Sequence, residues 1–118
     1  MKVTDKKVKE VQELTLDEKI IAWKEEYKKI FKNVIDGKDY IWRRIKRQEY
    51  ADIMGMKDGD SVDERIYNRQ YAITKAVVLN ISKEELEADL EELAGLAATI
   101  ADEVLEKSGF AASQTIEL

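Results

Sequence analysis

The sequence predicts an α+β domain, mainly helical, with about five helices and one β-hairpin near residues 29–45. The hairpin is indicated by an Asp36-Gly37 pair between two apolar and aromatic runs, because both residues accept the positive φ of a type I′ turn. Helices are indicated by apolar residues that recur every three or four positions in the flanking segments. Three capping boxes mark helix starts: Thr15 with Glu18, Ser61 with Glu64, and Ser82 with Glu85.

The length and composition predict one compact folded unit. A chain of 118 residues is of the usual size for a single domain, and 44% hydrophobic residues can form a core. The 38% of charged residues predict a strongly charged exterior. We expect the domain to cover residues 15–110. The segments 1–14 and 111–118 are expected to be a flexible arm and a flexible tail, because few of their residues favour a helix or a strand.

The first helix is expected at 16–27, directly after the Thr15 capping box. Ile20, Trp23 and Tyr27 recur at helical spacing and form one apolar stripe, while Lys and Glu occupy the other positions. This pattern predicts that Trp23 belongs to the core.

The hairpin arms are expected at 30–35 and 38–45. Side chains alternate along a strand. The second arm therefore presents Tyr40, Trp42 and Arg44 on one face and Ile41, Arg43 and Ile45 on the other. Since neither face is purely apolar, we expect the hairpin to be half exposed.

Two helices are expected directly after the hairpin. The first covers 47–54, turns Tyr50, Ile53 and Met54 inward and ends at Gly55. The second covers 62–79 and is the most apolar, which predicts the central helix of the core. Its expected core-facing residues are Val62, Ile66, Ala72, Ile73, Ala76, Val77 and Leu79.

Two further helices complete the expected fold. One covers 83–92, with Leu86, Leu90 and Leu93 on one side. The last begins near Leu96 and ends at Ser108-Gly109, with Gly109 as a left-handed C-cap and Phe110 folded back on the last turn.

The residue types present argue against catalysis and metal binding. The chain has no His and no Cys, which removes the commonest general base, the thiol nucleophile and the usual transition-metal ligands. Acidic pairs such as Glu91-Glu92 are sequence neighbours whose side chains diverge on a helix. The turn cluster at 57–60 lacks the spacing of a calcium loop, and no Gly-rich phosphate loop is present. We therefore expect no catalytic, cofactor-binding or metal-binding residues, and no cofactor.

Charge and hydropathy limit the partners and the compartment. Residues 1–59 hold 15 basic and 12 acidic side chains, a net +3, whereas residues 60–118 hold 5 and 13, a net −8. This asymmetry permits self-association or a basic partner and disfavours nonspecific nucleic-acid binding.

No signal peptide opens the chain and no apolar run approaches 18 residues, so we expect a cytosolic protein that does not span a membrane.

One basic run has the residue types of a nucleic-acid surface. Arg43, Arg44 and Arg47 follow Tyr40 and Trp42, and aromatic side chains stack on bases while Arg neutralises phosphate. Alternation divides this cluster between two faces, which favours protein contacts. An alternative is that Arg44 and Arg47 pair with carboxylates of the acidic C-terminal half.

A family resemblance adds a specific function. The order of a Trp23 helix, the stretch 40–50, the apolar helix segment 75–79 and the late helix 96–110 resembles small tail assembly chaperones of tailed bacteriophages and prophages. The resemblance implies a noncatalytic protein of the host bacterial cytoplasm that binds the tape measure protein and keeps it soluble during tail assembly. The alternatives are a virion structural subunit of the tail or baseplate, and a nucleic-acid-binding module.

The expected partner-binding residues come from the hairpin and the late helix. In the late helix an apolar stripe is flanked by small alanines, so it could receive a partner helix or complete the domain's own core. The core reading is favoured for Ile100 and the partner reading for Phe110. The full set is Tyr40, Trp42, Arg43, Arg44, Arg47, Leu96, Ile100, Val104 and Phe110.

Overall fold

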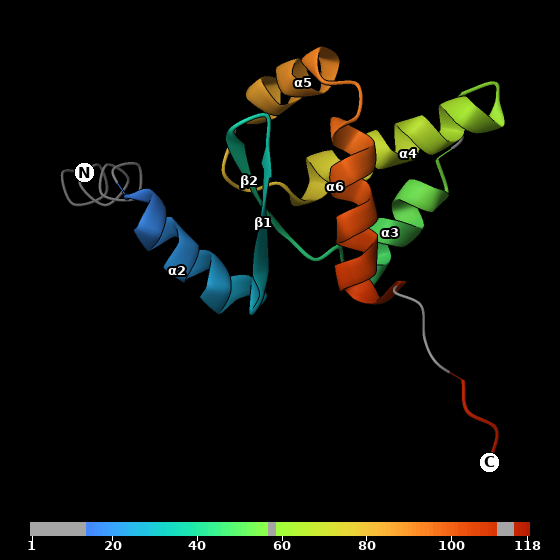
Figure 1. Cartoon of the computed structure of the whole chain (residues 1–118), viewed down its shortest axis with the longest axis horizontal. Helices are drawn as coiled ribbons and strands as arrows, with labels where there is room; N and C mark the ends of the chain where they lie inside the picture. The colour runs from blue at the N-terminus through green and yellow to red at the C-terminus, as the bar shows by residue number, and fades with distance from the viewer. Residues whose placement is uncertain (1–13, 57–58, 111–114) are drawn as a thin grey trace, which may run out of the picture. The chain divides into compact units, whose positions relative to one another are not determined.

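The computed structural model describes residues 14–56, 59–110 and 115–118, and the chain divides into two units, residues 1–30 and 31–118. The expected arm at 1–13, Lys57-Asp58 of the turn cluster and the first half of the expected tail lie outside the described residues. The described part confirms the fold class, a small α+β fold with five α-helices and a two-stranded hairpin (Figure 1). The elements are α2 (Leu16–Tyr27), β1 (Ile30–Ile35), β2 (Lys38–Arg43), α3 (Arg47–Met54), α4 (Val62–Val77), α5 (Lys83–Glu92), α6 (Leu96–Leu105) and a π-helical turn η1 (Glu106–Phe110).

In the first unit, α2 begins at the predicted capping box. The backbone N–H of Glu18 donates to the Thr15 hydroxyl at 3.2 Å, and the Thr15 N–H donates to the Glu18 carboxylate at 3.5 Å. No residue of α2 is buried, and Trp23 is only half-buried, so its assignment to the core is wrong. The physical reason is that an apolar stripe needs a second layer; the described part of this unit is essentially the one helix, which cannot bury its own face.

The hairpin turn has the predicted geometry. Asp36 and Gly37 have φ values of 52° and 74°, both positive as a type I′ turn requires. The expectation that the hairpin is half exposed is wrong for its second strand, where Tyr40, Ile41 and Trp42 are all buried. Because these three residues alternate in direction, both faces of β2 are covered at this point. The edge of β2 that does not pair with β1 forms an isolated antiparallel bridge between Trp42 and Val78.

The helices of the second unit keep close to their predicted bounds. Both α3 and α5 begin and end where expected, and Gly109 has the predicted left-handed conformation, with φ 102°. In contrast, α4 stops at Val77, two residues early, because Val78 is extended and pairs with β2. No described helix is long and apolar enough to cross a membrane.

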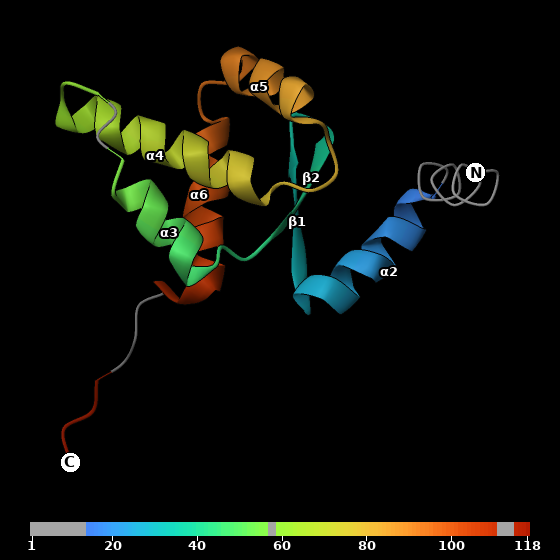
Figure 2. The same ribbon diagram turned by 180° about the vertical axis from the view of Figure 1, so that it is seen from behind.

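The core lies where α6 packs against α4, and Figures 1 and 2 show this crossing from opposite sides. Half of the ten residues of α6 are buried, whereas the three buried residues of α4 are Ile73, Thr74 and Val77, all in its C-terminal half. The N-terminal half of α4 extends past α6 in both views, and Val62 and Ile66 are 67% and 48% exposed there. Their assignment to the core is therefore wrong, and α6 is the more buried helix.

Candidate functional site

Five of the expected partner-binding residues are part of the core. They share exposed fractions of at most 1%, and they are Tyr40, Trp42, Leu96, Ile100 and Val104. A folded domain does not offer these side chains to a partner, which corrects their assignment. The physical reason is that α4 covers the apolar stripe of α6, so the stripe completes the domain's own core.

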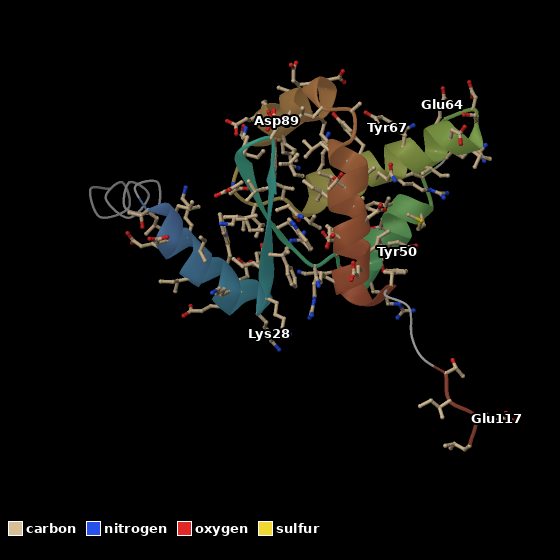
Figure 3. All side chains as sticks on the ribbon, viewed as in Figure 1. Lys28, Tyr50, Glu64, Tyr67, Asp89 and Glu117 are labelled. Carbon is tan, nitrogen blue, oxygen red and sulfur yellow. The ribbon has the colours of Figure 1, made fainter. Side chains whose placement is uncertain are left out.

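The polar atoms of the two buried aromatic residues are satisfied internally. The Tyr40 hydroxyl donates to Asp89 of α5 at 2.8 Å, and the Trp42 indole N–H donates to Asn33 at 2.7 Å. Burial and the bond to Asp89 raise the pKa of Tyr40 to about 12. Lys38 donates to the same carboxylate at 2.8 Å and holds the pKa of Asp89 below its usual range. These contacts join β2 to α5, as the position of Asp89 in Figure 3 illustrates.

Arg43 joins three elements. Its two terminal nitrogens each donate to one carboxylate oxygen of Glu49 in α3, both at 2.7 Å, and one also donates to the carbonyl of Ala76 in α4 at 2.9 Å. The guanidinium holds the pKa of Glu49 below its usual range. Such a two-point geometry is specific to arginine. Arg43 therefore serves contacts within the domain.

Arg44 and Arg47 are exposed, and neither forms an ion pair with any residue in the described part of the chain. The expected pairing of these two arginines with the acidic C-terminal half is therefore wrong. The reason is positional: Arg43, at the end of β2, reaches Glu49 across the first turn of α3, while the Arg44 guanidinium lies 5.9 Å from the Phe31 ring.

Phe110 is an expected contact residue that remains accessible. Its ring is 53% exposed and lies 4.6 Å from the Tyr50 ring of α3, between centroids. The Ser108 hydroxyl accepts a bond from the Ile45 N–H at 3.1 Å, which holds η1 beside the start of α3. Phe110 is expected to fold back on the last turn of its own helix, whereas the structure places its ring against Tyr50 of α3. Arg44 and Arg47, at the start of α3, are exposed as well, so cationic and aromatic side chains are accessible along the first turns of this helix.

A larger surface feature, which sequence reasoning missed, is an open cavity of about 620 Å³ between α3 and α4. We call it the α3–α4 groove. Apolar and charged side chains line it together: Glu49, Ile53, Met56, Asn68, Tyr71, Ala72, Lys75, Ala76 and Lys83. The only sequence signal was the pair of small residues, Ala72 and Ala76, one turn apart on α4.

Two lysines line the α3–α4 groove, and an ion pair holds one of them in place. Lys75 donates to Glu87 of α5 at 2.6 Å and lies 5.0 Å from the centroid of the Tyr71 ring. Contact with Glu87 raises the pKa of Lys75, so its charge persists at neutral pH. Lys83, at the start of α5, makes no ion pair with a described residue. The groove thus combines apolar side chains with fixed positive charge.

Among the described residues, no group of three or more His, Cys, Asp or Glu side chains could hold a metal ion. The α3–α4 groove offers shape, apolar area and charge, which are the elements of protein recognition.

Comparison of the chain with protein-family models, curated proteins and solved structures finds no match.

Proposed function

We propose that the chain is a noncatalytic tail assembly chaperone of a tailed bacteriophage or prophage, which binds the tape measure protein in the host bacterial cytoplasm. The observation that carries this proposal from the structure is the α3–α4 groove. It supports the binding of an amphipathic client helix, because such a helix lays its apolar face into a groove between two helices.

The residues of the α3–α4 groove suit a helical client. Ala72 and Ala76 are small, so a client helix can approach α4 closely, while Ile53 and Tyr71 supply apolar contact. Burying one client Leu or Ile stabilises a complex by roughly 1.5–3 kcal/mol, so a few such side chains suffice for a specific complex. Lys83, which makes no ion pair with a described residue, favours a client helix with acidic residues beside its apolar face.

A second accessible surface supports the same role. Arg44 and Arg47 lie at the start of α3, Phe110 contacts Tyr50 of the same helix, and all three are exposed. Aromatic and arginine side chains are enriched at protein interfaces. This surface and the groove lie at different places along α3, so an extended client could contact both.

The test is coexpression with the tape measure protein of the phage or prophage that, on this proposal, encodes the chain, followed by affinity purification. Replacement of Ala72 with Arg places a long charged side chain in the groove and should abolish copurification while the melting temperature stays close to that of the wild type. Ile66→Arg is the matched control, because Ile66 lies on the same helix, is 48% exposed and does not line the groove. Binding should survive in this control.

Two results would contradict the proposal. If Ala72→Arg folds and still copurifies with the client at the wild-type level, the groove is not the client site. If the chain does not bind the tape measure protein but is retained in purified phage particles, it is a structural subunit of the virion.

A further inference from the structure

A second cavity, of about 480 Å³, lies at the C-terminal end of α3. It is lined by Met54, Gly55, Met56, Arg65 and Arg69, and we call it the Met/Arg pocket. The two arginines are one turn apart on α4 and the two methionines flank the end of α3. The pocket therefore combines adaptable apolar side chains with two positive charges.

The arginines of the Met/Arg pocket have unused hydrogen-bonding capacity. The Nε atom of Arg69 is buried and has no hydrogen-bond partner, and one Nη atom of Arg69 donates to the Met54 carbonyl at 3.3 Å. Arg65 donates through its Nε to the Gly59 carbonyl at 3.2 Å. Neither arginine forms an ion pair with a carboxylate of the described residues. A carboxylate ligand would supply the acceptors that these donors lack.

The segment 115–118 of the same chain has the complementary chemistry. Its sequence is Thr-Ile-Glu-Leu, it forms no regular structure, and all four residues are exposed. Ile116 is 70% exposed, and Leu118 is fully exposed. In an extended backbone Ile116 and Leu118 point to one side and Glu117 to the other. The segment therefore offers two apolar side chains and a carboxylate that forms no ion pair with the residues that the structure describes.

The tether is long enough for the segment to reach the pocket of its own chain. Phe110 is anchored against Tyr50, 4.6 Å between ring centroids, and Tyr50 precedes Met54 by one turn of α3, which is about 6 Å along the helix axis. The six residues from 111 to 116 can span up to about 20 Å. A tether of this length also creates an effective concentration on the order of millimolar, which favours binding within one chain over binding between chains.

We propose that the Met/Arg pocket is a docking site for residues 115–118 of the same chain. The Glu117 carboxylate accepts hydrogen bonds from Arg65 and Arg69, and Ile116 and Leu118 pack on Met54 and Met56. Met56 also lines the α3–α4 groove, so the docked segment lies beside the client surface and competes with a client there. This competition rests on the proposed function, whereas the docking itself does not.

The test uses the full chain, which contains no cysteine, so that Thr115→Cys gives a single site for a nitroxide label. Isotope-labelled methionine methyl groups report the distance to the label through paramagnetic broadening. The expected result is strong broadening of the Met54 and Met56 signals in the labelled chain. It should be lost in the double variant Arg65→Glu and Arg69→Glu, and reduced by Glu117→Lys, while the control Arg47→Glu at the other end of α3 keeps it.

A second experiment shows whether the docked segment belongs to the same chain or to a second copy. Chains that carry only the nitroxide are mixed with chains that carry only the isotope. Docking within one chain predicts no broadening in this mixture, at any concentration at which chains that carry both labels show broadening. Broadening in the mixture would mean that a second copy supplies the segment and would overturn the proposal. Broadening that is equal in the wild type and in the Arg65/Arg69 variant would also overturn it, because the pocket would then play no part. Both readouts are independent of any client, so they can fail or succeed separately from the proposed function.

Discussion

The contact between Arg43 and Glu49 gives a prediction that can be worked from the structure. Arg43 makes two 2.7 Å hydrogen bonds to Glu49 and one of 2.9 Å to the Ala76 carbonyl, and its side chain is only 11% exposed. Arg43→Met removes these bonds, together with the bond from Arg43 to the Arg44 carbonyl at 3.0 Å, and keeps much of the side-chain volume. Arg43→Lys keeps the charge and loses the two-point geometry.

The magnitude follows from the burial of the pair. Exposed ion pairs contribute roughly 0.2–1 kcal/mol, whereas removing one partner of a fully buried pair costs about 3–5 kcal/mol. Glu49 is 30% exposed, so the pair is intermediate, and the Ala76 carbonyl also loses its donor. We expect Arg43→Met to lower the free energy of unfolding by about 3 kcal/mol and Arg43→Lys by about 1.5 kcal/mol.

The assay is urea denaturation followed by tryptophan fluorescence, with a double-mutant cycle between Arg43→Met and Glu49→Gln. Arg43 lowers the pKa of Glu49 in the folded state, so the pair contributes stability above the ordinary Glu pKa of about 4.3. This stability is lost as the pH falls through the lowered folded-state pKa. The coupling energy should therefore be about 2 kcal/mol at pH 7 and approach zero at strongly acidic pH.

Two outcomes would refute this reasoning. A coupling energy below about 0.5 kcal/mol at pH 7 would mean that water screens the pair as it screens an exposed one. A coupling energy that does not change between neutral and acidic pH would mean that the charge of Glu49 is not its source.

Three further predictions concern single side chains. Tyr40→Phe should lower the free energy of unfolding by about 1 kcal/mol near neutral pH; because the folded-state pKa of Tyr40 is raised to about 12, this difference should disappear as the pH rises from 10 towards 12, which equilibrium unfolding at several pH values would show. Ile100→Ala should cost roughly 2–5 kcal/mol in denaturant unfolding, while the same assay on Val34→Ala, a 61% exposed strand residue, should change by less than about 0.5 kcal/mol. Phe110→Ser should leave the melting temperature nearly unchanged and reduce copurification of the tape measure protein, since half of the ring is exposed; a large drop in melting temperature would instead show that its contact with Tyr50 is structural packing.

Local signals in the sequence determined the elements of this fold. The bounds of α3 and α5, the positive φ values of Asp36 and Gly37, and the left-handed Gly109 all follow from residues within one turn of the feature. The capping boxes show the limit of such signals. Glu18 completes its box with Thr15. At α5 only half of the predicted box forms: Ser82 accepts the Glu85 N–H at 3.1 Å, but the Glu85 carboxylate pairs with Lys38 of β2 at 2.9 Å, a contact that no local pattern specifies.

Only the tertiary structure decided which apolar and charged residues are accessible. Periodicity shows that Val62, Ile66 and Ile73 share one face of α4, but it does not show how much of that face another helix covers. Because α6 crosses only the C-terminal half of α4, Ile73 is buried and Val62 is exposed. The α3–α4 groove has the same origin. It exists because the consecutive helices α3 and α4 lie side by side next to the start of α5 and leave Tyr71 and Ala72 only partly buried between them, and that arrangement depends on long-range packing.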